Sequence, residues 1–245
     1  MSTQSSIEWT EMTWNPMVGC TKVSPGCKNC YAEAMAKRLK AMGMRGYQNG
    51  FRLNLMPERL SEPLDRRKPT VYFVNSMSDM FHEKVPFEYM ERVFEVMRKS
   101  PQHTFQVLTK RAERMAEYCK GRTVPRNVWL GVSVENRKYG LPRIPVLRGI
   151  DAPVRFLSIE PLLEDLGTFD VTGIQWAIIG GESGRKARPM KPLWVDGIKR
   201  QCDEAGVKFF FKQWGAWGPD GEKRSKAANG REYRGAFWDA MPQVT

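Results

Sequence analysis

The sequence predicts an α/β fold, a partial TIM-like barrel of six or seven parallel strands with its active site at the carboxyl ends of the strands. Three observations favour this fold. Short apolar runs alternate along the chain with segments of helical periodicity, which is typical of βαβ units. The apolar runs are nearly continuous, as in strands covered on both faces. Polar or glycine-rich residues follow each run. A doubly wound open sheet is the alternative.

The elements can be placed in chain order. The segment that leads into Cys20 supplies the first strand. Apolar and β-branched runs predict further strands at residues 70–75, 104–109, 127–134, 154–159, 174–181 and 207–212. Helical spacing predicts helices at residues 87–99, 111–120 and 193–206. We expect residues 1–215 to form the barrel. Residues 216–245 form a C-terminal extension, for which the glycine and charge content allows either a lid or a tail.

Composition narrows the class of protein. The chain has 245 residues, of which 41% are hydrophobic and 11% aromatic, so we expect a globular protein. It has no apolar run long enough for a membrane span. The N-terminal residues lack the basic and apolar regions of a secretory signal. Together with five cysteines, this favours a reducing cytoplasm, where clustered cysteines more often bind metal than form disulfides.

The net charge indicates a polyanionic partner. Lys and Arg number 39 and Asp and Glu number 27, which gives a formal charge of +12. Nucleic acid is the first candidate partner for such an excess. A solvated basic surface without a partner is the alternative.

Three cysteines, Cys20, Cys27 and Cys30, have the spacing C-x6-C-x2-C. A structural zinc site would use four ligands, and the other cysteines, Cys119 and Cys202, lie in helical patterns. Zinc with a distant fourth ligand remains an alternative. An iron–sulfur cluster explains the odd number better, because three thiolates leave one iron free to bind a substrate or cofactor.

The residues around these cysteines resemble the radical S-adenosylmethionine (SAM) superfamily. The matching phrases are "NPMVGC" and "CKNCYAEA". The usual motif of that superfamily is C-x3-C-x2-C on the loop after the first barrel strand. Here the first gap has six residues, and Pro25-Gly26 supplies a turn that can bring the sulfurs together.

A narrower resemblance covers nearly all of residues 7–215. Phrases such as "GCTKVSPGCKNCYAE", "VYFVNSMSDMFH", "GVSVEN", "SIEPLL" and "IIGGESG" are similar to a phage-associated family with three clustered cysteines. Some similar phage proteins are radical SAM isomerases that rearrange an amino-acid substituent on thymine in viral DNA. For a phage-encoded protein, the compartment would be the host cytoplasm.

The resemblance implies a 4Fe-4S cluster on Cys20, Cys27 and Cys30, with SAM as cofactor and flavodoxin or ferredoxin as electron donor. The end of the second barrel strand would meet the SAM amino group, and the end of the fourth the ribose. Lys110 is a candidate partner for the SAM carboxylate. Each of these residues could instead be a local cap or turn residue. The candidate cofactor-binding residues are Tyr31, Asn75, Ser76, Asp79, Lys110, Ser133, Glu135, Gly180 and Gly181.

The remaining polar strand ends are candidates for substrate contacts. A carboxylate such as Glu160 could anchor a substrate amine, and basic residues interleaved with aromatics suit phosphate contacts and base stacking. Trp214 could instead simply close the barrel end. The candidate substrate residues are Glu160, Glu182, Lys212, Gln213 and Trp214, and the candidate nucleic-acid-binding residues are Arg185, Lys186, Arg188 and Lys191.

These observations predict a cytoplasmic radical SAM enzyme that forms a 5′-deoxyadenosyl radical and modifies a base in nucleic acid, with DNA favoured. By resemblance, the reaction is an isomerisation of an amino-acid substituent on thymine. One alternative is repair or modification of another nucleic-acid lesion. An alternative of another class is a non-catalytic nucleic-acid-binding module that zinc or a cluster stabilises.

Overall fold

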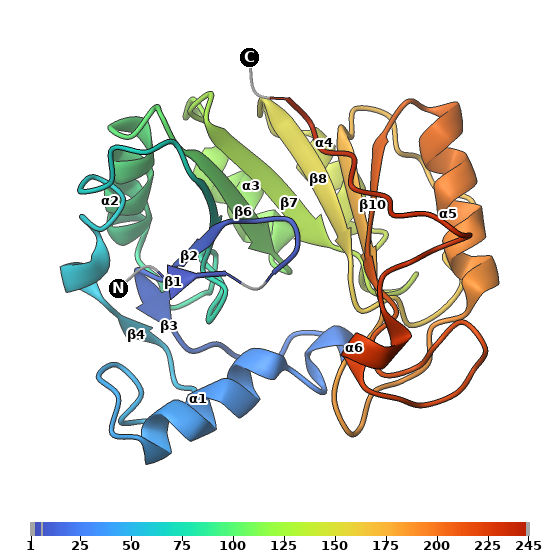
Figure 1. The fold of residues 1–245 in the computed structure, drawn as a ribbon. Coiled ribbons are helices and arrows are strands. Elements are labelled where there is room, and N and C mark those ends of the chain that lie inside the picture. Colours follow the sequence, from blue (N-terminus) through green and yellow to red (C-terminus); the bar gives the residue numbers. More distant parts are fainter. Residues whose placement is uncertain (1–2, 6, 244–245) are drawn as a thin grey trace.

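The computed structural model describes residues 3–5 and 7–243. In this part of the chain, seven parallel strands form the main sheet, which curls into a half-barrel (Figure 1). The strand order is β1-β2-β5-β6-β7-β8-β9-β10, with β1 antiparallel to β2 at one edge. The predicted partial barrel is therefore confirmed.

The parallel strands are β2 (Met12–Trp14), β5 (Val71–Val74), β6 (Thr104–Thr109), β7 (Val128–Ser133), β8 (Val154–Ile159), β9 (Trp176–Gly180) and β10 (Lys208–Gln213). The remaining strands are β1 (Thr3–Gln4), β3 (Met17–Val18) and β4 (Asn54–Leu55), of which β3 and β4 form a separate two-stranded sheet. The helices are α1 (Tyr31–Ala41), α2 (Phe87–Arg98), α3 (Ala112–Cys119), α4 (Arg143–Arg148), α5 (Pro192–Glu204) and α6 (Lys226–Asn229), with 3-10 turns η1 (Pro25–Cys27) and η2 (Pro57–Arg59).

The larger core lies between the sheet and the helices. Side chains of α2, α3, α4 and α5 pack there against the strands, and these helices cover the outer face of the half-barrel (Figure 1). In α2, buried residues such as Met90, Val93 and Met97 recur at helical spacing, as the sequence predicts. The sequence did not reveal α4, because Pro145 interrupts its short helical pattern.

A second, smaller core contains no helix residues and fills part of the concave face of the sheet. It is formed largely by aromatic side chains. The ring of Trp176 lies 5.7 Å from that of Trp129, 5.6 Å from Phe156 and 6.0 Å from Phe210, measured between ring centroids. The position that a Cβ on Gly131 would take is filled by the Phe156 ring. We call this cluster the aromatic floor, and it restricts polar chemistry to the carboxyl ends of the strands.

The segment after β10 packs along the edge of the sheet. The backbone N–H of Phe211 donates to the carbonyl of Trp238, and the indole N–H of Trp176 donates to the carbonyl of Ala240 at 2.9 Å. Tyr233 is buried in the larger core. These contacts cover β10, which would otherwise be an unprotected edge strand. No helix among residues 3–5 and 7–243 combines the length and apolarity needed to span a bilayer.

Candidate functional site

Polar side chains of neighbouring strands lie above the aromatic floor. Side chains at every second position of a strand share a face, so counting in steps of two from Trp129 and Phe156 leads to Ser133 and Glu160. The contacts agree with this register. Lys110 Nζ donates to Ser133 Oγ at 3.0 Å, and Lys212 Nζ donates to the two carboxylate oxygens of Glu160 at 2.9 and 2.7 Å.

The three clustered cysteines lie on one loop at this same edge of the sheet. Cys20 follows β3, Cys27 ends η1 and Cys30 immediately precedes α1. All three are free thiols and are partly buried. Among the described residues, no three His, Cys, Asp or Glu side chains are placed to hold a single metal ion. Three accessible thiols on one loop are nevertheless the donor set that iron–sulfur clusters use, so these residues fit a cluster.

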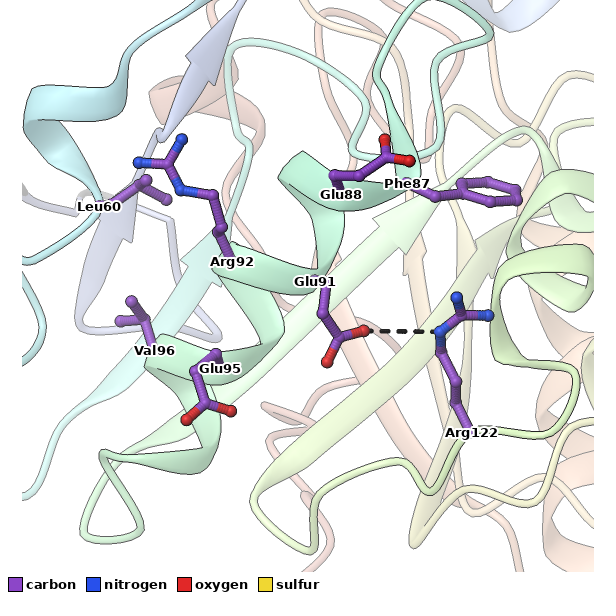
Figure 2. A pocket seen from close by; sticks show the side chains of 8 residues that line it. All are labelled: Leu60, Phe87, Glu88, Glu91, Arg92, Glu95, Val96 and Arg122. Carbon is purple, nitrogen blue, oxygen red and sulfur yellow. Dashed lines mark ion pairs between the residues drawn. The ribbon is translucent and has the colours of Figure 1, made fainter.

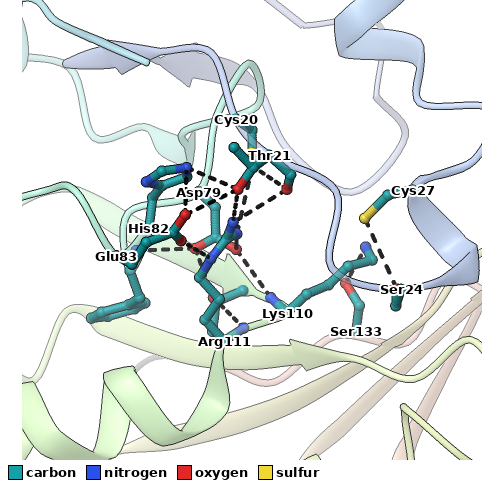
Figure 3. Close-up of polar contacts among 12 residues, drawn as sticks. Cys20, Thr21, Ser24, Cys27, Asp79, His82, Glu83, Lys110, Arg111 and Ser133 are labelled. Carbon is teal, nitrogen blue, oxygen red and sulfur yellow. Dashed lines mark hydrogen bonds and ion pairs between the residues drawn. The ribbon is translucent and has the colours of Figure 1, made fainter. Parts of the chain in front are cut away.

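Cys20 contacts a buried arginine that sequence reasoning missed. Arg111 Nη1 donates to Cys20 Sγ at 3.5 Å and to Asp79 Oδ2 at 3.0 Å. Figure 3 shows this guanidinium among Thr21, Asp79 and Glu83, close to the cysteine loop. Burial raises the pKa of the Cys20 thiol to about 11, and Asp79 adds to this effect while Arg111 opposes it. The signal in the sequence is the pair of basic residues, Lys110 and Arg111, at the end of β6, of which only Lys110 has a predicted role.

Asp79, a predicted cofactor contact, already has several partners within the protein. One carboxylate oxygen accepts from the backbone N–H of Phe81 and from Thr109 Oγ1, and the other from the backbone N–H of Lys110 and from Arg111. These bonds join the loop after β5 to the end of β6. In the structure, Asp79 therefore positions the Arg111 side chain beside Cys20.

A second set of contacts fastens the far end of the cysteine loop. Asn29 Nδ2 donates to Glu182 Oε2 at 3.1 Å, and Arg188 Nη2 donates to Glu182 Oε1 at 2.6 Å and to the carbonyl of Pro25 at 3.0 Å. We call Asn29, Glu182 and Arg188 the loop latch. The sequence predicted a substrate contact for Glu182 and a phosphate contact for Arg188, but the structure pairs their charges with each other.

Glu135 supports the middle of the loop. Its side chain is fully buried and accepts from Arg143 Nη1 at 2.7 Å. A Cβ added to Gly26 would lie 3.1 Å from the Glu135 side chain, so the turn lies directly against it. Burial acts to raise the pKa of Glu135, but Lys110 and Arg143 outweigh burial and hold the pKa below its ordinary value. In the structure this carboxylate is held in its ionised form and supports the loop, and the ribose contact that the resemblance implies for it stays a prediction.

The end of β5 carries the other predicted cofactor contacts. Asn75 has a left-handed backbone, with φ of 62°, and its side chain is buried with neither amide atom hydrogen-bonded. Ser76 Oγ accepts from Asn15 Nδ2 at 3.1 Å, and the Tyr31 hydroxyl donates to the Ser76 carbonyl. A buried amide without a partner is costly, which makes Asn75 a candidate for a ligand contact.

The candidate substrate residues near the end of β10 do not all lie together. Gln213 Nε2 donates to Glu160 Oε1 at 3.1 Å and to the Gly181 carbonyl at 2.8 Å, so Glu160, Lys212 and Gln213 form one cluster. Trp214 is buried against Phe211, and its indole N–H donates to the Glu232 carbonyl. The structure thus assigns Trp214 to the core, in line with the alternative that it closes the barrel.

The glycines after β9 have an explanation within the chain. A Cβ on Gly181 would lie 1.9 Å from the Trp214 carbonyl oxygen, and one on Gly180 would lie 3.1 Å from Glu160. Their small size therefore allows close packing of the protein itself. Arg185, Lys186 and Lys191 are exposed on the segment that follows, next to the loop latch.

A surface pocket of about 710 Å³ lies elsewhere, along α2. Figure 2 shows its mixed charges, including the ion pair between Glu91 and Arg122. None of the residues that line it belongs to the cysteine loop or to the strand ends described above. It is therefore separate from the candidate site.

Comparisons with known proteins agree with this fold. A family model described as "Protein of unknown function (DUF5131)" matches residues 4–242, and no curated protein matches the sequence. Spore photoproduct lyase complexed with dinucleoside spore photoproduct has a TM-score of 0.50 and 10% identity, over 84% of this chain and 65% of that chain. A variant of this lyase has a TM-score of 0.52 and 8% identity, over 85% and 78%. This chain thus spans less than two thirds of the length of the complexed lyase, and at such identities the likeness is one of fold.

Proposed function

The chain belongs to the DUF5131 family, and from its own residues we propose that it is a radical SAM enzyme that modifies a base in nucleic acid. The observation that carries this proposal is the set of three free thiols, Cys20, Cys27 and Cys30, on one loop at the carboxyl edge of a parallel half-barrel. The aromatic floor fills part of the concave face of the same sheet. A reactive species made at the cysteines would thus be formed above a wall of apolar side chains.

The cysteines would hold a 4Fe-4S cluster, which supplies the electron that cleaves SAM to methionine and a 5′-deoxyadenosyl radical. The residues at the strand ends then have defined tasks. Lys110, whose ammonium group has donors besides the one used by Ser133, would bind the SAM carboxylate by a charge-assisted hydrogen bond. Asn75 would offer its unpaired amide donor and acceptor. The partly buried setting of these groups limits access of water to the reacting centre.

The substrate is inferred from the net charge of the protein and from the side-chain cluster of Glu160, Lys212 and Gln213. The formal charge of +12 and the exposed Arg185, Lys186 and Lys191 support a nucleic-acid partner, and we favour DNA. The lyase of similar fold is complexed with a dinucleoside photoproduct, which supports a base as the target. Glu160 and Lys212 could bind the amine and carboxylate of an amino-acid substituent on thymine, and an isomerase acting on that substituent is the finer form of the proposal. Flavodoxin or ferredoxin would supply the electron.

Cluster assembly and SAM cleavage test this function together. Anaerobically reconstituted protein should contain iron and sulfide, and after reduction in the presence of DNA it should convert SAM to 5′-deoxyadenosine. Cys20→Ala, Cys27→Ala and Cys30→Ala should each lose the cluster. Cys119→Ala is the matched control, because Cys119 is a buried thiol on α3, and it should keep the cluster. A colourless protein with stoichiometric zinc would overturn the proposal.

A further inference from the structure

Every N–H group of the Arg111 guanidinium is used, and one of them points at a cysteine sulfur. An arginine side chain has five such donors. Nε donates to Glu83 Oε2 at 3.1 Å, Nη1 donates to Cys20 Sγ and to Asp79 Oδ2, and Nη2 donates to the carbonyl oxygen and the hydroxyl of Thr21 at 3.2 and 2.8 Å. We propose that Arg111 raises the reduction potential of the cluster bound to Cys20. This inference rests on the proposed function.

The geometry fixes the position of this charge. The Arg111 side chain is only 9% exposed, and its acceptors come from the loop after β5 and from the cysteine loop itself (Figure 3). His82 extends the same network, since its Nε2 lies 3.0 Å from Thr21 Oγ1. A guanidinium held by five acceptors cannot swing away from the sulfur without breaking several hydrogen bonds.

Electrostatics gives the direction of the effect. Reduction adds a negative charge to a cluster, so a nearby cation and a hydrogen bond to a ligand sulfur both favour the reduced state. The Asp79 carboxylate acts in the opposite direction, because it places a negative charge near Cys20, and Arg111 Nη1 contacts both groups. Because Arg111 lies between the Asp79 carboxylate and the sulfur, its loss would remove one favourable charge and leave an unfavourable one unopposed.

The two members of this ion pair should therefore shift the potential in opposite directions. In Arg111→Gln the midpoint potential should become more negative than in wild type. In Arg111→Lys, which keeps the charge but not the five-donor fork, the shift should have the same sign and be smaller. In Asp79→Asn the potential should become more positive. Arg98→Gln is the control, because Arg98 is an exposed residue at the end of α2, and it should leave the potential unchanged.

The measurement is an anaerobic redox titration of each reconstituted protein, followed by electron paramagnetic resonance. A purely structural Arg111 would lower the amount of cluster without moving the potential of the cluster that remains. That result, with wild-type protein that binds a cluster and cleaves SAM, would overturn the role of Arg111 and leave the proposed function standing. Wild-type protein that binds no cluster would overturn both.

Discussion

Glu135 and Arg143 show how buried charge supports the cysteine loop. The side chain of Glu135 is fully buried and that of Arg143 is 6% exposed. Breaking a buried ion pair by removing one partner leaves the other charge uncompensated. We therefore expect Glu135→Gln to lower the free energy of unfolding by about 3–5 kcal/mol. Urea denaturation would measure this. The control is Glu95→Gln, because the Glu95 side chain is 43% exposed and its loss should leave the midpoint almost unchanged.

The same pair predicts a pH dependence of stability. The pKa of Glu135 in the folded protein lies below its ordinary value of 4.5, so the unfolded chain takes up the proton first as the pH falls. The contribution of Glu135 is thus present above about pH 4.5 and is lost as the pH falls through the lower folded-state pKa. Stability in wild type should fall more steeply over this acid range than in Glu135→Gln. Equal slopes from pH 7 to pH 3 would contradict the pairing.

Candidate ligands can be proposed from the sequence where the signal is local. Cys20, Cys27 and Cys30 stand within eleven residues of one another, and their odd number favours a cluster over a four-ligand zinc site, which stays a prediction. Their supporting partners are distant in sequence, since Arg111 is 91 residues from Cys20 and Glu182 is 153 residues from Asn29. No periodicity or spacing records such contacts, so the sequence predicts ligand contacts for Glu182 and Arg188 but does not reveal the ion pair between them.

The cysteine loop is an irregular element that is fastened at both ends, by Arg111 near Cys20 and by the loop latch near Cys30. Hydrogen bonds to charged groups contribute about 1.5–3 kcal/mol each. We expect Arg188→Met to open the loop locally and to speed hydrogen exchange of the backbone amides of residues 26–30 by about 10-fold or more, without a matching loss of global stability. Exchange followed by mass spectrometry would measure this. The exposed neighbour Arg185→Gln should exchange as wild type does, and equal rates in Arg188→Met would show that the latch does not hold the loop.

Regular elements were predicted better than irregular ones. The strands β6 and β8 have the predicted bounds, 104–109 and 154–159, because each is a continuous buried run with a clear polar boundary. The short β1 and the proline-containing α4 lack such a pattern and depend on tertiary packing. The sequence allows either a lid or a tail for the segment after β10. Its contacts with β10 arise from single side chains and backbone groups, which leave no repeat in the sequence.

For the molecule as a whole, the excess of positive charge predicts salt-dependent DNA binding. Binding to DNA phosphates releases counterions, so affinity falls as the salt concentration rises. On a plot of log affinity against log salt concentration, each phosphate contact adds about −0.9 to the slope. Replacing Arg185, Lys186 and Lys191 together by Gln should reduce this slope by about 2–3 and weaken binding to all sequences similarly. The control is a second triple variant, in which Gln replaces Arg67, Lys68 and Lys120. These three residues are exposed and lie before β5 or after α3, away from the cysteine loop.

Fluorescence anisotropy with duplex DNA across a salt series would give these slopes. Equal slopes for the two triple variants would show that the basic segment after β9 is not the DNA-binding surface. No binding at low salt, together with activity on a free nucleoside or nucleotide, would show that the positive charge serves another purpose.

The central claim is that three cysteines hold a cluster with one iron open to SAM. The most direct measurement is the electron paramagnetic resonance spectrum of reduced, reconstituted protein before and after addition of SAM, with iron counted on the same sample. We expect about four iron atoms per chain and a spectrum that changes when SAM is added, because SAM binds the open iron. Four irons with a spectrum insensitive to SAM, or zinc in place of iron, would contradict the claim.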